Sequence, residues 1–183
     1  MMTDQLMGRL RRCRTFHDAV QTILNDTVAL HGAEYGDLQL RDGDTLLIVA
    51  QRNLTAEFLK TFREVTVAEG SACGRALQTC TTVVVQDVEN DPEYAQFREA
   101  ARQARYRSVQ TTPLCTSDGG IIGMVSTLFV NPHLPTKIEL ATLEKYSVAA
   151  ADYLFELLDG KELGSEARKM NKLIYECATE LSL

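Results

Sequence analysis

Two pairs of strand-like segments, each joined by a tight turn, constrain the fold of this chain most strongly. The first pair comprises residues 34–41 and 45–52 around Asp-Gly-Asp, and the second comprises 107–115 and 121–130 around Ser-Asp-Gly-Gly. Alternation with a period of two is typical of strands, and glycine-containing turn sequences such as Asp-Gly supply the positive φ angles of a tight hairpin. The sequence therefore predicts two antiparallel hairpins.

Helices are predicted before, between and after the hairpins, where apolar side chains recur at steps of three and four. The predicted helices cover 4–30, 54–64, 72–79, 92–105 and 137–158, and two further strands cover 65–67 and 81–86. We expect His31-Gly32 to end the first helix. Ser71 and Thr136 are predicted N-caps, and Pro92 suits the first position of its helix.

The C-terminal segment has a narrow apolar stripe at heptad-like spacing, which predicts a coiled-coil seam. Its members are Leu163, Ala167, Met170, Ile174, Cys177 and Leu181. Asp159-Gly160 marks a break before it. We therefore divide the chain into a domain over 1–158 and a C-terminal signalling helix over 159–183, and we expect the long terminal helices to project from an α+β domain with a central antiparallel sheet.

Size and charge exclude several classes of protein. A chain of 183 residues suits one hydrophobic core, and its net charge of -6 disfavours nucleic acid as a partner, because nucleic-acid binding uses clustered Lys and Arg. The one basic cluster, at residues 9–14, is interpreted as a solvated helix face. No window approaches the roughly 18 apolar residues of a membrane span, so we expect a cytoplasmic protein.

The five cysteines, at positions 13, 73, 80, 115 and 177, form an odd and scattered set without a Cys-x-x-Cys pair. This pattern disfavours both a disulfide framework and a structural zinc site. We expect reduced thiols and no metal.

Cys73 lies in the segment EGSACGRALQTCTTVVVQDVENDPEY, residues 69–94, and has three interpretations. Tight packing at a helix start is the default, and contact with a ligand or catalysis are the alternatives. A nucleophile would benefit from the helix N-terminus but also needs a base, and no histidine is near in sequence.

Polar residues in the second hairpin allow either a ligand pocket or a solvent-facing sheet. Thr111 and Ser126 face the same side if this hairpin closes at 117–120. Asp87, after the valine run, could contribute a carboxylate to a pocket, although a turn-forming role is the default. The residues that we predict to line a pocket are Cys73, Asp87, Gln110, Thr111, Ser126 and Phe129.

The order of these segments resembles a GAF domain at the input end of bacterial signalling proteins such as histidine kinases. The resemblance covers residues 15–158, and the segments that carry it are GAEYGDLQL, LLIVAQRNL, the 69–94 segment, YRSVQTTPLCTSDGGIIGMVSTLF and NPHLPTKIELATLEKYSVAAADYLFEL. It implies a sheet of five or six antiparallel strands with a helical layer on one face and a ligand pocket on the other. It also implies a homodimer through the terminal helices that passes a signal to an output domain.

The resemblance leaves the ligand unidentified. Cyclic-nucleotide-binding members carry an Asn-Lys-Phe-Asp-Glu signature that this sequence lacks. Bilin-binding members attach the chromophore to a cysteine usually followed by His, whereas Cys73, Cys80 and Cys115 are followed by Gly, Thr and Thr. We expect neither cofactor.

The sequence predicts a module that binds a small molecule or senses redox state, and not an enzyme. The rival class is a thiol enzyme acting through Cys73 or Cys115, similar to free methionine-R-sulfoxide reductase. The reactive cysteine of that family follows the valine-rich strand, where this chain has DVENDPEYAQF. A dimerisation scaffold with a filled core is the third interpretation.

Overall fold

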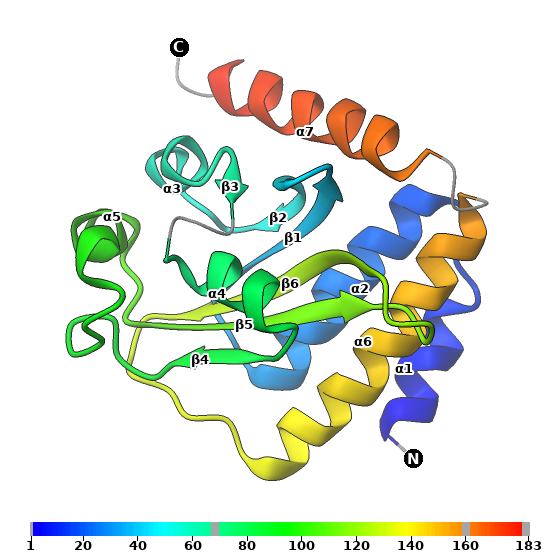
Figure 1. Ribbon diagram of the computed structural model, residues 1–183, viewed down its shortest axis with the longest axis horizontal. Helices are drawn as coiled ribbons and strands as arrows, with labels where there is room; N and C mark the ends of the chain where they lie inside the picture. Colours follow the sequence, from blue (N-terminus) through cyan, green and yellow to red (C-terminus); the bar gives the residue numbers. More distant parts are fainter. Residues whose placement is uncertain (1, 67–69, 159–161, 181–183) are drawn as a thin grey trace.

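The computed structural model describes residues 2–66, 70–158 and 162–180, which form one six-stranded sheet with helices on both faces (Figure 1). The strands are β1 Tyr35–Asp42, β2 Thr45–Arg52, β3 Val65–Thr66, β4 Val83–Val85, β5 Ser108–Cys115 and β6 Ile121–Phe129. They are arranged in the order β3-β2-β1-β6-β5-β4, and every neighbouring pair is antiparallel. The predicted α+β class and both hairpins are confirmed.

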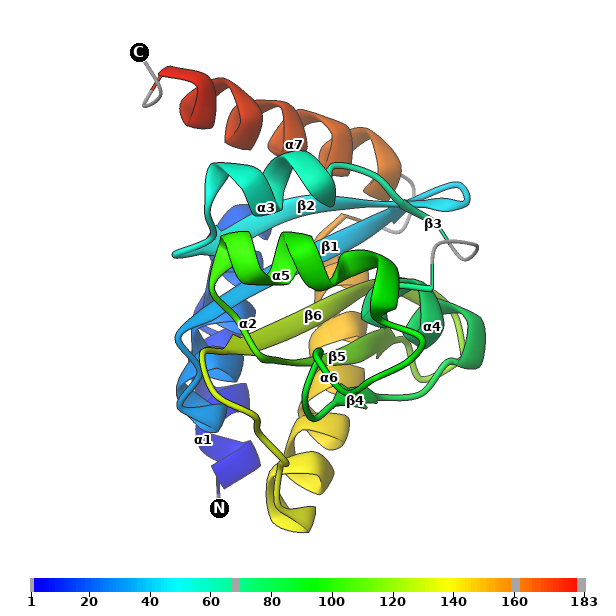
Figure 2. The same cartoon turned by 90° about the vertical axis from the view of Figure 1, so that its left-hand side faces the viewer.

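The sheet separates two hydrophobic cores. On one face, α1 (Met2–Leu10), α2 (Phe16–His31) and α6 (Lys137–Leu157) cover the first core. On the other, α3 (Ala56–Thr61), α4 (Ala72–Thr79) and α5 (Arg98–Ala104) cover the second. Figure 2 shows α3 and α5 in front of the sheet and α1, α2 and α6 beyond it. Both faces of the sheet are therefore buried, which matters for the polar side chains on its strands.

Local sequence signals set several helix ends as predicted. Gly32 ends α2 with a left-handed φ of 60°, a conformation that glycine adopts without steric cost. The Ser71 hydroxyl accepts a hydrogen bond from the Gly74 amide at the start of α4. Thr136 and Glu139 form a reciprocal capping box at the start of α6.

Two helix predictions are wrong. The helix expected over 4–30 is broken between α1 and α2, because Thr15 caps a new start by accepting from the Asp18 amide. This break lets both helices bury their apolar faces in the same core. The helix expected from Pro92 begins only at Arg98 after a 3-10 turn, because the Asp91 carboxylate binds the amides of residues 93 and 94 in a separate turn.

Helix α7 (Leu163–Glu180) lies along the β2 side of the sheet and contacts both cores (Figure 1). Asn171 donates to the Ile48 carbonyl at 2.8 Å. Ala167 and Met170, from the apolar stripe, are buried within the chain itself. The expectation that α7 projects from the domain is therefore wrong, because its stripe covers the sheet edge. The predicted break at 159–160 and Leu181 lie outside the described residues.

Candidate functional site

Three polar side chains from neighbouring strands form one row on the sheet face covered by α3, α4 and α5. Asp37 of β1 pairs with Ser126 of β6, which in turn pairs with Thr111 of β5. Directly paired residues in antiparallel strands share a face, so the row is a consequence of register. The Thr111 and Ser126 hydroxyls are 3.0 Å apart, and both are fully buried.

Helix α4 adds Cys73 to this row from above. Its thiol lies 3.4 Å from the Ser126 hydroxyl and 3.6 Å from the Thr111 hydroxyl. The Ser71 cap positions Cys73 by starting the helix two residues earlier. Cys73 is thus a contact between α4 and the hydroxyls of the polar row.

A cavity of about 20 Å³ lies between this row and the helical layer. This volume holds about one water-sized group. The residues that line it are Asp37, Gln39, Phe58, Phe62, Ser71, Ala72, Cys73, Tyr94, Val109, Ser126 and Leu128. Its floor is therefore polar and its roof is largely aromatic and aliphatic.

Asp37 and Gln39 make the cavity floor electrostatically unusual. Each residue is 1% exposed, and Asp37 Oδ1 and Gln39 Oε1 have no hydrogen-bond partner among the described residues. Burial raises the pKa of Asp37 to about 7, because desolvation disfavours the carboxylate, and a hydrogen bond with Ser126 opposes this only in part. Buried acceptors without partners are uncommon and costly.

The cavity roof is held by aromatic contacts. The Tyr94 and Tyr106 hydroxyls are 2.9 Å apart, and burial raises the pKa of both, so they remain neutral phenols. The Phe58 and Phe62 ring centroids are 4.6 Å apart. The Phe58 and Tyr106 centroids are 5.9 Å apart and those of Phe62 and Phe97 are 5.4 Å apart, so ring contacts link α3 with the segments on either side of α5.

The structure brings together three of the six predicted pocket residues, Cys73, Thr111 and Ser126. Asp87 lies elsewhere: Arg107 binds its two carboxylate oxygens, at 2.8 and 2.7 Å from Nη2, and this hydrogen bonding lowers the pKa of Asp87. It also accepts from the Glu89 amide, so its turn-forming role accounts for the residue. The expectation that Asp87 faces the same pocket is wrong.

Gln110 and Phe129 also lie away from the cavity. Gln110 pairs with Thr127, whose hydroxyl is 3.1 Å from His31 Nδ1 on α2, so this pair faces the other helical layer. Phe129 stacks on His133 at 3.9 Å between ring centroids. Because side chains alternate along a strand, Gln110 and Thr111 could not both face one pocket.

Sequence reasoning missed Asp37, Gln39 and Tyr94. The available signal was the polar alternation of residues 34–41, which is equally typical of a strand with one solvated face. The apolar faces of α3 and α5 must pack against the sheet. The part of the sheet that they cover includes Asp37 and Gln39. Only the sheet order shows that coverage.

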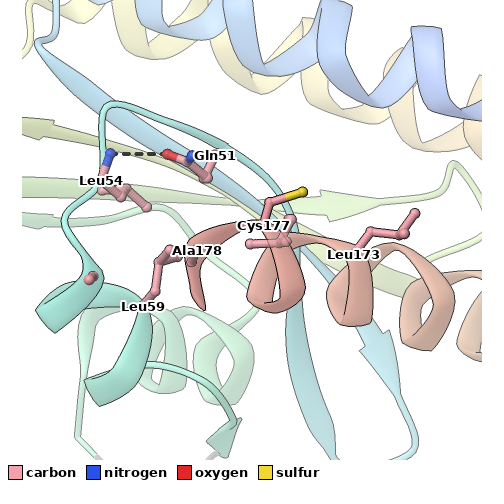
Figure 3. Close-up of a pocket in the computed structure, with 8 residues that line it drawn as sticks. Gln51, Leu54, Leu59, Leu173, Cys177 and Ala178 are labelled. Atoms are coloured by element: carbon pink, nitrogen blue, oxygen red, sulfur yellow. Dashed lines mark hydrogen bonds between the residues drawn. The ribbon is translucent and has the colours of Figure 1, made fainter. Parts of the chain in front are cut away.

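A larger and more open groove of about 430 Å³ lies between α3 and α7 (Figure 3). Leu54 and Leu59 line one side, and Leu173 and Cys177 line the other. Gln51 at its end accepts a hydrogen bond from the Leu54 amide. The groove is mainly apolar, and within the described part of the chain no Asp, Glu, His, Lys or Arg lines it.

Among residues 2–66, 70–158 and 162–180, no group of three His, Cys, Asp or Glu side chains could hold a metal ion. Within the same described ranges, no helix has the length and apolarity needed to cross a bilayer.

The fold and the site define an α+β domain that encloses a polar cavity between an antiparallel sheet and a helical layer. A sequence profile of the family described as GAF domain matches residues 13–154. The chain therefore belongs to the GAF domain family.

Solved structures share this fold at low sequence identity. The GAF domain of a phosphoenolpyruvate-protein phosphotransferase from Coxiella burnetii has a TM-score of 0.73 at 14% identity, over 87% of this chain and 94% of that one. Free methionine-R-sulfoxide reductase from Neisseria meningitidis, in complex with its substrate, has a TM-score of 0.65 at 21% identity, over 87% of this chain and 89% of that one. The chromophore-binding domain of a bacteriophytochrome from R. palustris has a TM-score of 0.63 at 11% identity, over 87% of this chain and 61% of that one. No curated protein sequence matches the chain.

Proposed function

We propose that this GAF domain is a sensory module in which a small molecule enters the cavity and alters the position of α7. The carrying observation is a buried polar floor, beneath a roof of helices, on which Asp37 Oδ1 and Gln39 Oε1 have no hydrogen-bond partner among the described residues. Two of the structural neighbours are described as binding a chromophore and a substrate, so this fold accommodates small molecules. The domain acts by binding, without catalysis.

Helix α3 is the element that would transmit the binding event. Phe58 on one side of α3 lines the cavity, whereas Leu59 on the other side lines the groove against α7. The Tyr175 hydroxyl of α7 donates to the Leu59 carbonyl at 2.6 Å. A ligand that displaces the Phe58 ring therefore moves α3, and α7 is hydrogen-bonded to α3 through Tyr175. Such a ligand shifts the α7 equilibrium by its differential affinity for the two positions.

We place the homodimer contact on α6 and the exposed side of α7. Val148 and Phe155 are exposed seven residues apart on α6, and Leu173 is 60% exposed on α7. Single exposed apolar residues are common, but a row along one helix favours association with a second helix. Sedimentation of the chain over a range of concentrations tests this contact, with Phe155→Glu expected to weaken the dimer. An output domain joined through α7 would then receive the signal.

Ser126→Leu tests the cavity as the binding site. The larger side chain fills the cavity beside Cys73 and should displace a bound molecule. Native mass spectrometry of the gently purified parent chain should show one additional mass per protomer that is lost on denaturation. The Ser126→Leu protein should lack this mass, while its circular dichroism remains that of the parent.

Ser117→Leu, at an exposed turn position, is the matched control and should keep the additional mass. If the parent chain itself is bare, even after incubation with a cellular metabolite extract, the sensory proposal fails and the scaffold interpretation gains support. If Ser126→Leu retains the mass, the molecule binds elsewhere.

Thiol labelling tests the rival enzyme class. Burial raises the pKa of Cys115, and the neighbouring Cys80 raises it further, which is the reverse of what a thiolate nucleophile requires. We expect iodoacetamide to label Cys115 in the folded chain more slowly, and only at higher pH, than in the urea-unfolded chain. Peptide mapping after pulses at several pH values measures this. Faster labelling of Cys73 or Cys115 in the folded chain below about pH 7 would support a thiol enzyme.

A further inference from the structure

Two acceptor oxygens on the cavity floor have no hydrogen-bond partner among the described residues. Asp37 Oδ1 and Gln39 Oε1 both belong to β1, two residues apart, so their side chains lie on the same face. An ionised Asp37 would orient the hydroxyl chain so that Thr111 donates to Ser126 and Ser126 donates to Asp37. In that arrangement, Asp37 Oδ1 and Gln39 Oε1 are the oxygens of the floor that can accept hydrogen bonds from a ligand.

Cationic side chains do not supply the missing donors. No Lys, Arg or His lines the cavity in the part of the chain that the structure describes. Arg75 is close enough to act on Tyr94, but it does not line the cavity: Nη1 and Nη2 donate to Asp91, Nη1 also donates to Glu93 at 2.7 Å, and Nε has no partner among the described residues. An anionic ligand would therefore meet a second negative charge in a low-dielectric site without a compensating cation.

We propose that the cavity recognises a primary ammonium group, which donates N–H bonds to Asp37 and Gln39 in a site of its own size. This inference rests on the proposed small-molecule function and names the class of ligand. A water-sized ammonium group fits a cavity of about 20 Å³, and its several N–H donors match two acceptor oxygens. The remainder of a larger amine would extend under the aromatic roof and displace Phe58 or Phe62.

We expect the pH dependence of the site to follow the Asp37 carboxyl. The titratable side chains that act on it or share its cavity are Cys73 from α4, Tyr94 before α5, Tyr106 before β5 and Tyr175 from α7. Burial raises the pKa of the three tyrosines, and the Arg63 guanidinium lies over the Tyr175 ring at 4.9 Å. Neutral phenols leave the ammonium to pair with ionised Asp37.

The test uses methylammonium chloride as the probe and the thermal midpoint of the full chain as the readout. We expect the midpoint to rise with methylammonium, and not with sodium chloride at equal ionic strength, with methanol or with sodium formate. Methanol matches the probe in heavy atoms without its charge, and formate reverses the charge. The apparent affinity should rise about fifty-fold between about pH 5 and about pH 7 and less than twofold above, as Asp37 ionises.

Asp37→Asn keeps the shape of the side chain and removes its charge, so it should abolish the methylammonium shift. Asp44→Asn is the matched control, since the Asp44 side chain is fully exposed in the β1–β2 turn, and it should retain the shift. A shift that survives in Asp37→Asn, or an equal shift with methanol or formate, would overturn the ammonium assignment.

The same measurements separate this inference from the proposed function. If methylammonium has no effect while Ser126→Leu still loses a co-purified molecule, the cavity is a ligand site of another chemical class and the ammonium assignment is wrong. If both results are negative, the sensory proposal fails together with it.

Discussion

The Asp37→Asn variant should lose a pH dependence of stability that the parent chain has. The pKa of Asp37 rises from an ordinary 3.8 to about 7 on folding, so the folded state holds its proton more tightly. The stability that the Asp37 carboxyl contributes to the parent is fully present below about pH 4 and is lost as the pH rises through about 7. A shift of this size corresponds to about 4 kcal/mol. The free energy of unfolding of Asp37→Asn, relative to that of the parent, should therefore rise by about 4 kcal/mol as the pH is raised from about 4 to about 8.

Urea unfolding at a series of pH values measures the difference between the two chains. Taking the difference cancels the carboxylates that titrate in the opposite sense, such as Asp87 and Glu139, whose pKa values hydrogen bonds lower. Asp44→Asn should follow the parent at every pH. A constant difference between Asp37→Asn and the parent would show that Asp37 stays ionised in the fold, and its burial would then need a cation that the described residues do not provide.

Gly123→Ala should destabilise the domain by about 3 kcal/mol or more. Gly123 lies on β6 opposite Leu40 of β1, and an added β-carbon would overlap the main-chain carbonyl oxygen of Gln39. The backbone of β1 cannot move aside, because β2 and β6 hold it on both sides. The same carbonyl belongs to a cavity residue, so the variant should also weaken ligand binding.

Gly8→Ala provides the matched control for this change. Gly8 lies in α1 with nothing within 4 Å of an added β-carbon, and alanine favours a helix over glycine by up to about 1 kcal/mol. Chemical denaturation of both variants should therefore give changes of opposite sign. A Gly123→Ala protein as stable as the parent would mean that β1 and β6 are paired more loosely at this point than the register indicates.

Much of the fold could be predicted from the sequence because its signals are local. The turn at Gly43, the cap at Ser71 and the capping box at Thr136 each depend on residues within a few positions of one another. The helix over 4–30 was wrongly joined because its apolar period continues through residues 11–15. The Thr15 cap interrupts the helix without disturbing that period.

The site was predictable only in part. Thr111 and Ser126 could be paired because one hairpin turn sets their register. Gln110 was assigned to the same pocket, although alternation along β5 places it on the other face. Asp37 was missed because its partner strand β6 is distant in the chain, and nothing local shows that β1 and β6 are neighbours.

The sequence by itself determined the hairpins, most helix ends and the membership of one α+β class, since these follow from hydrophobic period, turn chemistry and capping. Tertiary structure decided which sheet face each polar strand residue meets and where α7 lies. It placed Asp37 beneath aromatic side chains, and it turned the apolar stripe of α7 onto the β2 edge. These outcomes depend on strand order and helix docking, which bring together residues far apart in the chain and which no local pattern encodes.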